Sequence, residues 1–310
     1  HVIDTVIVGA AGLPTPTLNI AEVATAAGSF ETLLAALSAA DLVGALTDAD
    51  KSYTVFAPTD AAFAKLGTDA INGLLADPSA LADILLYHVY ADAVVLADGA
   101  ISVAASDQSI LEMANATAEK SGGRTALSLS DTGLTVNLAS VTSANVMTSN
   151  GVIHVIDNVM LPPPSKGDVT TNIVDTAIAA GTFTTLLTAL ETAGLVDALS
   201  DPDGKFTVFA PTDAAFDLID ADALSALLAD TEALTTLLTT HVIAGSAVDA
   251  VTAYSLNGTM VETLSGKAVG IAIEDGSLRI QGAKVISSDI YTTNGIIHVI
   301  DRVITDPASE

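Results

Sequence analysis

The sequence has no cysteine and no tryptophan, and aromatic residues make up only 4% of its 310 residues. Without cysteine the chain can form neither a disulfide nor a thiolate metal site. No apolar run reaches the roughly 18 residues that a membrane-spanning helix needs. The richest stretch, 81–105, is interrupted by Asp83, His88, Asp92 and Asp98. The core must therefore be built from Leu, Val, Ile and Ala.

Basic residues are also scarce, since 10 Lys and Arg face 37 Asp and Glu and give a net charge of -27. Phosphate contacts need clustered Lys and Arg, so this charge excludes an electrostatic nucleic-acid binder. It also disfavours docking on anionic lipid. A surface this acidic repels itself unless salt screens it, which favours a salty exterior; a calcium-rich surface is the alternative interpretation.

The chain consists of two copies of one unit. The run Tyr-Thr-Val-Phe-Ala-Pro-Thr-Asp-Ala-Ala-Phe at 53–63 recurs, with Phe for Tyr, at 206–216. His88 and Asn150 are 62 positions apart whereas His241 and Asn294 are 53 apart, so the second copy lacks nine residues. We place this deletion at 115–125, which has the composition of an exposed loop. Units of this length are domains rather than solenoid repeats.

The repeats predict a first domain-sized unit at 17–163, a linker at 164–169 and a second unit at 170–306. Residues 1–13 open with His-Val-Ile-Asp. The same four residues occur at 154–157 and at 298–301, within a motif near the end of each unit. We interpret them as the last strand of a preceding unit, so we expect an array of at least three. Such a strand can pair with a sheet edge, which allows head-to-tail self-association.

Each unit runs from helices to a strand, then to helices and several strands, and this order predicts an α+β fold. Asn19 and Ser29 are expected to cap helices over 20–27 and 30–40. Pro58 should end a strand over 53–57. The remaining elements are predicted as helices from Thr59 or Asp60 to Leu66, at 68–76 and at 78–87, and as strands at 93–96, 101–104, 125–129, 134–138 and 141–146.

The motif Asn-Gly-x-Ile-His-Val-Ile-Asp-x-Val occurs at 150–159 and again at 294–303. Read as a strand, it is mostly apolar on both faces, which predicts a central strand covered on both sides. The Asn150-Gly151 pair before it predicts a tight turn, because both residue types tolerate positive φ.

These two boxes, in the same order in both copies, resemble the fasciclin (FAS1) family over nearly the whole chain. The resemblance implies a wedge or sandwich of β-strands flanked by helices, secretion or cell-surface placement, and a role in adhesion. A Tyr-His pair between the boxes is implicated in partner binding in some relatives. It implies a partner-binding site here at Leu86, Tyr87, His88, Val89 and His241; the alternative is that these residues are core. Thr240 replaces the tyrosine in the second copy.

All five histidines belong to repeated motifs, which makes them buried hydrogen-bonding partners more readily than catalysts. Asp157 and Asp301 interrupt an apolar face and are expected to be buried carboxylates that accept backbone or hydroxyl hydrogen bonds. Asp60 and Asp213 are interpreted as helix caps. The motif residues with a structural role are then Pro58, Thr59, Asp60, His154, Asp157, Pro211, Thr212, Asp213, His298 and Asp301.

Other short patterns have ordinary interpretations. The acidic pairs 48–50 and 201–203 fit turns better than calcium loops, which need more oxygen ligands. Lys166-Gly167-Asp168 is interpreted as linker. Asn115 and Asn257 begin N-glycosylation patterns.

No nucleophile elbow, phosphate loop or histidine metal motif occurs, so we expect no enzyme, no metal and no cofactor. A hydrolase would need a cleft with convergent titratable groups. We therefore expect an extracellular or cell-surface adhesion or matrix-interaction protein whose partners are cell-surface or matrix proteins. The alternative is a polysaccharide- or calcium-binding extracellular matrix module.

Overall fold

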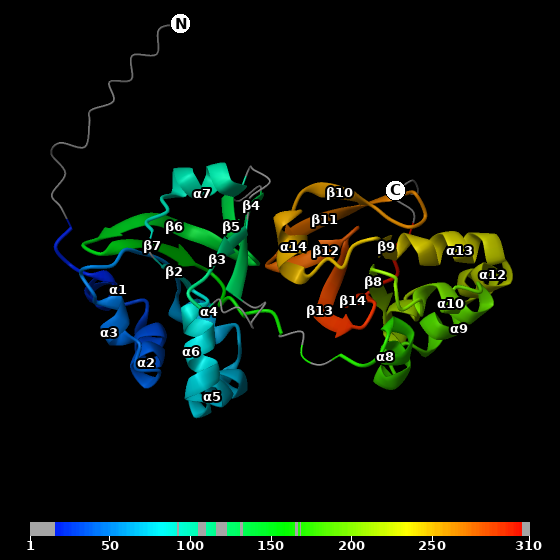
Figure 1. The fold of residues 1–310 in the computed structure, drawn as a ribbon, viewed down its shortest axis with the longest axis horizontal. Helices are drawn as coiled ribbons and strands as arrows, with labels where there is room; N and C mark the ends of the chain where they lie inside the picture. The colour runs from blue at the N-terminus through cyan, green and yellow to red at the C-terminus, as the bar shows by residue number, and fades with distance from the viewer. Residues whose placement is uncertain are drawn as a thin grey trace, which may run out of the picture.

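The computed structural model describes residues 16–91, 93–104, 110–115, 123–130, 133–164, 167 and 169–305. Within these ranges the chain forms two domains, each with a seven-stranded sheet and several helices (Figure 1). The predicted α+β class is therefore confirmed. The interpretation of residues 1–13 as a remnant strand lies outside the described residues.

The elements of the first domain are α1 (Ile20–Ala27), α2 (Glu31–Ala39), α3 (Val43–Leu46), β1 (Tyr53–Pro58), α4 (Asp60–Ala64), α5 (Thr68–Ala76), α6 (Pro78–Leu86), β2 (Val89–Ala91), α7 (Ala97–Ala104), β3 (Ile110–Glu112), β4 (Arg124–Ser130), β5 (Gly133–Val136), β6 (Ala139–Thr148) and β7 (Gly151–Ile156). The elements of the second are α8 (Ile173–Ala180), α9 (Thr184–Thr192), α10 (Val196–Leu199), β8 (Phe206–Pro211), α11 (Asp213–Phe216), α12 (Ala221–Ala229), α13 (Thr231–Thr240), β9 (Val242–Ala244), α14 (Ala250–Ser255), β10 (Thr259–Glu262), β11 (Ala268–Glu274), β12 (Ser277–Ile280), β13 (Ala283–Thr292) and β14 (Gly295–Ile300).

The closing strand of each domain is central, as predicted. The sheet order is β2-β1-β7-β6-β5-β4-β3 in the first domain and β10-β11-β12-β13-β14-β8-β9 in the second. Strand β7 pairs in parallel with β1 and antiparallel with β6, and β14 pairs in the same way with β8 and β13. The five strands β3 to β7 follow one another along the chain, whereas β1 reaches β7 only after most of the domain has been traversed.

The turn before the closing strand differs from the prediction in one respect. Only the glycine has positive φ, at 154° for Gly151, and Asn150 does not. A Cβ atom at Gly151 would lie 2.1 Å from the backbone oxygen of Tyr53, and one at Gly295 would lie 2.2 Å from that of Phe206. Glycine is therefore required here because the neighbouring parallel strand approaches its backbone.

Both faces of each sheet are covered by separate apolar clusters. In the first domain, α1 to α6 lie on one side of the sheet and α7 lies on the other (Figure 1). Val55 and Ile153 pack into the cluster on the side of the helices, while Phe56 and Ile156 pack into the cluster on the opposite side. The second domain repeats this division. Successive side chains of a strand point to opposite faces of the sheet, so each central strand contributes to both apolar clusters.

The helix starts confirm one cap and correct another. Asn19 caps α1 with a complete capping box to Glu22. Ser29 does not cap α2, because the helix begins at Glu31 and Phe30 holds the cap position without a side-chain hydrogen bond. The missing acceptor comes from Asp60, as described below.

Two predicted strands are wrong, at 93–96 and 101–104. Residues 97–104 form α7, whose buried residue is Ala100, and the alternating Ile101 and Val103 fit a helix equally well in so short a run. The segment 93–96 is irregular and is held by side chains instead, because the Thr54 hydroxyl donates to the Ala93 oxygen at 3.0 Å.

The deletion in the second copy is split between two places. Strand pairing aligns Glu112 with Glu262, because their partners in the next strand are Arg124 and Ala268. The segment between paired residues is thus twelve positions long in the first domain and six in the second. Six of the nine missing residues fall there, within the predicted loop, and the other three precede β10.

Candidate functional site

Tyr87 and His88, the predicted contact residues, lie in the core. Tyr87 is 0% exposed and His88 is 2% exposed; Val89 is also buried and Leu86 is partly buried. The Tyr87 hydroxyl donates to the Arg124 backbone oxygen at 2.5 Å and accepts from the Asn137 amide at 2.8 Å. Burial raises the pKa of Tyr87 to about 12, against the opposing effect of its hydrogen bonds. The geometry therefore favours the core interpretation of this pair.

His88 and His241 perform the same structural role in the two domains. The Nδ1 atom of His88 is 2.7 Å from the Ile84 oxygen, and its Nε2 accepts from the Met160 amide at 2.9 Å. His241 binds the Leu237 oxygen and the Ile304 amide in the same way, at 2.8 and 2.9 Å. Both rings are fully buried, and burial lowers the pKa of each to about 4. Each neutral imidazole thus joins the end of a helix to the segment that follows the closing strand.

His154 and His298, on the closing strands, are likewise enclosed. Their Nε2 atoms lie 2.8 Å from the backbone oxygens of Val95 and Val248. Their rings stack on Phe56 and Phe209. Burial is the main cause that lowers the pKa of both imidazoles. The structure does not bring any of these histidines together into one cluster.

Asp60 and Asp213 are helix caps, but of a different helix from the one expected. Thr59 caps α4 through its hydroxyl, as Thr212 caps α11, following Pro58 and Pro211 at the strand ends. Asp60 instead accepts from the Thr32 and Glu31 amides at the start of α2, at 2.7 and 3.2 Å. Burial raises the pKa of Asp60, but these hydrogen bonds outweigh it and leave the pKa below its usual value. Asp213 binds the start of α9 in the same manner.

Asp157 and Asp301 accept backbone hydrogen bonds, as predicted, but they are not buried. The side chains are 34% and 32% exposed. Asp157 accepts from the Ser140 amide at 2.7 Å, and Asp301 accepts from the Lys284 amide at 2.8 Å. Each carboxylate therefore fixes the register at the open end of the β6–β7 or β13–β14 hairpin.

The calcium and glycosylation patterns are used by the fold. The carboxylates of Asp48 and Asp201 each accept a hydrogen bond from the backbone amide two residues later, at 3.0 Å. This is the geometry of a turn. Asn257 donates to the Leu129 oxygen at 3.0 Å and accepts from the Ile273 amide at 2.7 Å. Among the described residues no group of three or more His, Asp or Glu could hold a metal ion. Lys166 and Asp168 of the linker tripeptide lie outside those residues.

The two domains are joined by polar contacts that the sequence analysis did not foresee. The Arg124 guanidinium of β4 lies 3.3 Å from the Asp249 carboxylate and donates to the Thr252 hydroxyl at 3.1 Å. Asp249 is also the N-cap of α14, which Figure 1 shows facing the first domain. The first domain thus binds the start of a helix in the second.

A comparison of the two copies contains the signal that would have found this junction. At the position of Arg124 the second copy has Ala268, and at the position of Asp249 the first copy has Leu96. The junction therefore forms at positions where the two copies have different residues, not at positions where they are identical.

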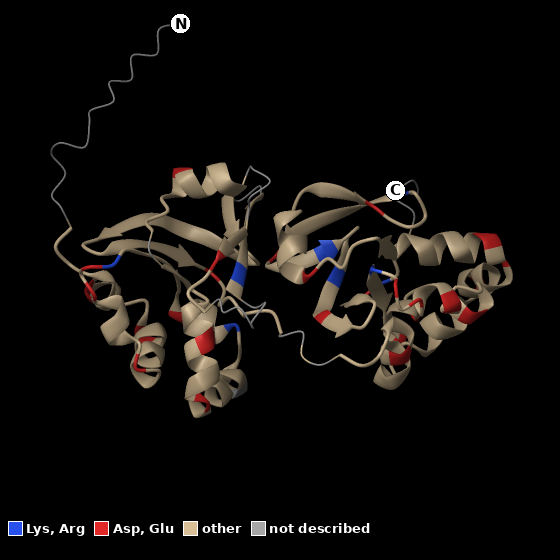
Figure 2. Cartoon of the chain, viewed as in Figure 1, with Lys and Arg blue, Asp and Glu red and all other residues tan. Residues whose placement is uncertain are grey.

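Charge is distributed without a basic patch among the described residues. Figure 2 shows acidic positions on the helices of both domains and few basic positions, some of them at the junction. In the same part of the chain, no helix is both long enough and apolar enough to cross a membrane.

Known proteins resemble this chain along most of its length. The model of the Fasciclin domain matches residues 28–162 and 181–306. Transforming growth factor-beta-induced protein ig-h3 of Sus scrofa is 32% identical over 256 residues, which are 82% of this chain and 34% of that protein. This chain thus spans about a third of ig-h3. Protein sll1483 of Synechocystis is 40% identical over 142 residues, which are 45% of this chain and 76% of that protein.

Among solved structures, a FAS1 domain pair from the insect cell adhesion molecule fasciclin I matches 91% of this chain and 99% of that chain, at 18% identity and a TM-score of 0.40. The match to the Fasciclin domain model agrees with the expectation that this protein is not an enzyme. Two matches to one family model, in the two domains that the structure separates, lead to a plain conclusion: the chain belongs to the fasciclin domain family.

Proposed function

We propose that the protein is an extracellular adhesion or matrix-interaction protein that presents two fasciclin domains as one rigid unit. Fasciclin domains occur in adhesion and matrix proteins, among them ig-h3, periostin and fasciclin I. The observation that carries the proposal is the polar junction of Arg124 with Asp249 and Thr252. Two weak contact sites held at a fixed separation gain avidity, because the second contact forms at a high effective concentration.

The imidazoles and carboxylates of the fasciclin motifs support this role indirectly. His88, His154, His241 and His298 each bind backbone atoms of their own domain. We infer that Tyr87 and His88 shape the surface above them and do not touch a partner, because both are buried. The contact residues must then be exposed ones on the outer faces of the two domains.

The test is retention of natural partners on the immobilised protein. Extracts of cell-surface and matrix proteins, and separately of cell-wall polysaccharide, are passed over wild type, Arg124→Ala and Arg302→Ala at low and high salt. We expect wild type and Arg302→Ala to retain the same matrix proteins, and Arg124→Ala to release them several-fold faster, since loss of a rigid pair weakens avidity. Arg302 is a suitable control because, within the part of the chain that the structure describes, its ion pair is with the adjacent Asp301, at 3.4 Å.

Two results would count against the proposal. If the wild-type protein retains nothing above background at any salt concentration, the proposed adhesion function is wrong. Retention of polysaccharide alone would assign the pair to carbohydrate binding instead.

A further inference from the structure

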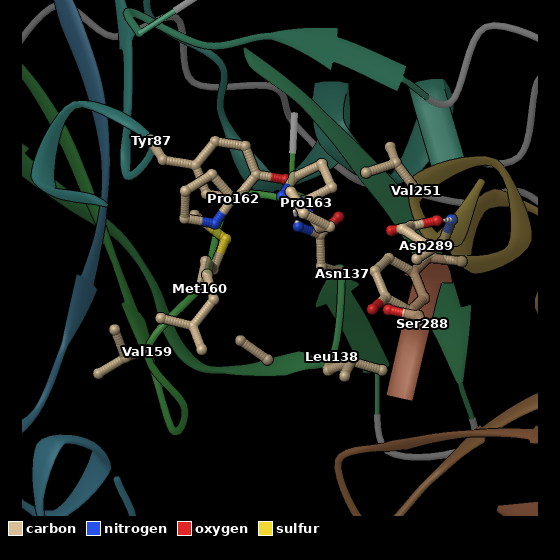
Figure 3. A pocket seen from close by; sticks show the side chains of 15 residues that line it. Tyr87, Asn137, Leu138, Val159, Met160, Pro162, Pro163, Val251, Ser288 and Asp289 are labelled. Atoms are coloured by element: carbon tan, nitrogen blue, oxygen red, sulfur yellow. Dashed lines mark hydrogen bonds between the residues drawn. The ribbon is translucent and has the colours of Figure 1, made fainter. Parts of the chain in front are cut away.

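A cavity of about 350 Å³ lies at the junction of the two domains. Figure 3 shows Tyr87, Met160, Pro162 and Pro163 on one side of it and Val251 on the other. Its walls are mostly apolar, and its volume falls within the range of small-molecule sites, which often form between domains. The proline segment that leads out of the first domain forms part of the wall, so the cavity exists only when both domains are in place.

One carboxylate in this wall lacks a full set of partners. Asp289 on β13 is 3% exposed. One of its oxygens, Oδ1, accepts from the Ala250 amide at 2.8 Å, as the dashed line in Figure 3 marks. The other, Oδ2, is buried and has no hydrogen-bond partner among the described residues. An unpaired buried carboxylate destabilises the fold unless it is neutralised or paired.

The fold itself does not require a carboxylate at this position. The first domain has Asn145 there, with the same φ of 59°, and its side-chain oxygen accepts from the Ala97 amide at 2.7 Å. Asparagine and aspartate both tolerate this left-handed backbone. The structural role is thus one hydrogen-bond acceptor, which an amide supplies. The charge of Asp289 is additional, and it occurs in the one domain where the residue faces the junction cavity.

Tyr254 is a second residue of the cavity that breaks the repeat. It lines the same space, and the corresponding residue of the first copy is Ile101. Tyr87, on the opposite wall, corresponds to Thr240. The two aromatic rings and the acidic group of the cavity are therefore all departures from the duplicated sequence. An apolar enclosure with aromatic walls and one acid has the chemistry of a site for an organic cation.

We propose that the junction cavity binds an organic cation, with an apolar body about the size of one aromatic ring and an amidinium, guanidinium or primary ammonium group that donates to Asp289. The cation is either a free small molecule or a basic side chain of a partner protein. The net charge of -27 raises the local concentration of either one. Because Oδ2 is itself shielded from solvent, the side chains around it must move apart when the cation enters.

The charged neighbours of Asp289 agree with this assignment. Burial raises the pKa of Asp289, the nearby His298 opposes this, and the charge of Asp249 adds to it. The Arg124 guanidinium does not neutralise the cavity acid, because it is engaged by Asp249 and Thr252. A cation beside Asp289 would lower its pKa and replace the partner that the fold does not provide.

Benzamidine is a suitable probe, and methyl-labelled methionine reports where it binds. The chain has four methionines, Met113, Met147, Met160 and Met260, and of these Met160 lines the cavity. We expect benzamidine to shift the Met160 methyl signal in a saturable manner and to leave the other three in place. Benzamide, which has the same shape without the charge, should bind at least tenfold more weakly.

Matched substitutions follow from the repeat. Asp289→Asn installs the residue of the first domain and should weaken benzamidine binding at least tenfold. Asn145→Asp makes the reciprocal change in the first domain and should leave binding unaltered. If Asp289→Asn fails to fold, the Met160 response of wild type to benzamidine and benzamide still decides the question.

The proposal is overturned if Met160 does not respond, if benzamide binds as tightly as benzamidine, or if folded Asp289→Asn binds as tightly as wild type. The source of the cation is separated by a second pair of probes, phenethylamine and the amide of the dipeptide Phe-Arg. Both should shift Met160; tighter binding of the dipeptide assigns the site to a partner's side chain, and tighter binding of phenethylamine assigns it to a small amine.

Discussion

The Arg124 guanidinium of the first domain lies 3.3 Å from the Asp249 carboxylate of the second, and this pair has no counterpart elsewhere in the duplicated sequence. Asp249 is already the cap of α14, where it accepts from the Thr252 amide at 2.8 Å. One carboxylate thus begins a helix and holds the neighbouring domain. Since the side chains are only 32% and 15% exposed, the pair is shielded more than an ordinary surface ion pair.

Arg124→Ala should lower the free energy of unfolding by about 1–2 kcal/mol, between the values typical of exposed and buried ion pairs, because Asp249 loses its partner at a partly buried site. Urea unfolding monitored separately in each domain measures this. The control Arg302→Ala removes an exposed pair with the adjacent residue and should change the free energy by less than about 0.5 kcal/mol. Equal effects of the two substitutions would show that the junction contributes nothing.

Asn150→Ala should destabilise the first domain by roughly 2–4 kcal/mol, because its buried amide serves three backbone groups. Its oxygen accepts from the Ile20 amide at 3.1 Å, and its nitrogen donates to the oxygens of Leu46 and Asp48 at 2.8 and 3.3 Å. Thermal or urea unfolding of the variant measures the loss. Asn158→Ala, at a half-exposed position that donates to the Leu138 oxygen at 3.3 Å, is the control and should cost well under half as much.

Gly295→Ala should prevent correct pairing of β14 with β8. The added Cβ would lie 2.2 Å from the Phe206 backbone oxygen, and backbone cannot move aside as a side chain can. We expect a loss of more than about 3 kcal/mol or a second domain that does not fold, read from amide exchange of β8 and β14. Gly282→Ala is the comparison variant. Its φ of 80° strains alanine, but nothing lies within 4 Å of the added Cβ. A milder effect at Gly295 than at Gly282 would contradict the close approach of the strands.

Stability should fall as the pH drops from about 6.5 toward 4, partly because of His88 and His241. Their pKa is about 4 when folded and about 6.5 when unfolded, so the unfolded chain takes up protons first as the pH falls. The stability that each neutral ring provides is complete above about pH 6.5. We expect each to account for about 2 kcal/mol of the loss between pH 7 and pH 5.

His241→Gln isolates that contribution. The variant is less stable than wild type at pH 7 but should lose about 2 kcal/mol less between pH 7 and pH 5, measured by urea unfolding at each pH. Changes in overall charge affect both proteins alike, so the difference between their slopes reports on the imidazole. Identical slopes would mean that His241 is not buried in a neutral form.

Much of the fold could be predicted from the sequence because its determinants are local and occur twice. Asn19 caps α1 as expected, and the apolar run at 151–156 forms a central strand. The strands predicted at 93–96 and 101–104 are wrong, and the conformation of 93–96 depends on Thr54 and His154 from distant strands rather than on its own pattern. Short apolar runs fit both periods equally well.

The candidate site was harder to predict than the fold. The motif residues Tyr87 and His88 were interpreted as partner-binding residues, yet both bind backbone atoms of their own domain. Arg124, Asp249 and Thr252 of the junction belong to no motif, and Arg124 lies more than a hundred positions from its two partners in sequence. The pairing of Arg124 with Asp249 depends on how the domains dock, which composition and periodicity do not encode.

The relaxation of backbone amide nitrogens across both domains tests the central claim, that two fasciclin domains are held as one rigid unit, most directly. The account predicts one rotational correlation time for both domains, appropriate to the whole 31.2 kDa chain, and two shorter and separate values for Arg124→Ala. Separate tumbling of the two domains in the wild-type protein would contradict it.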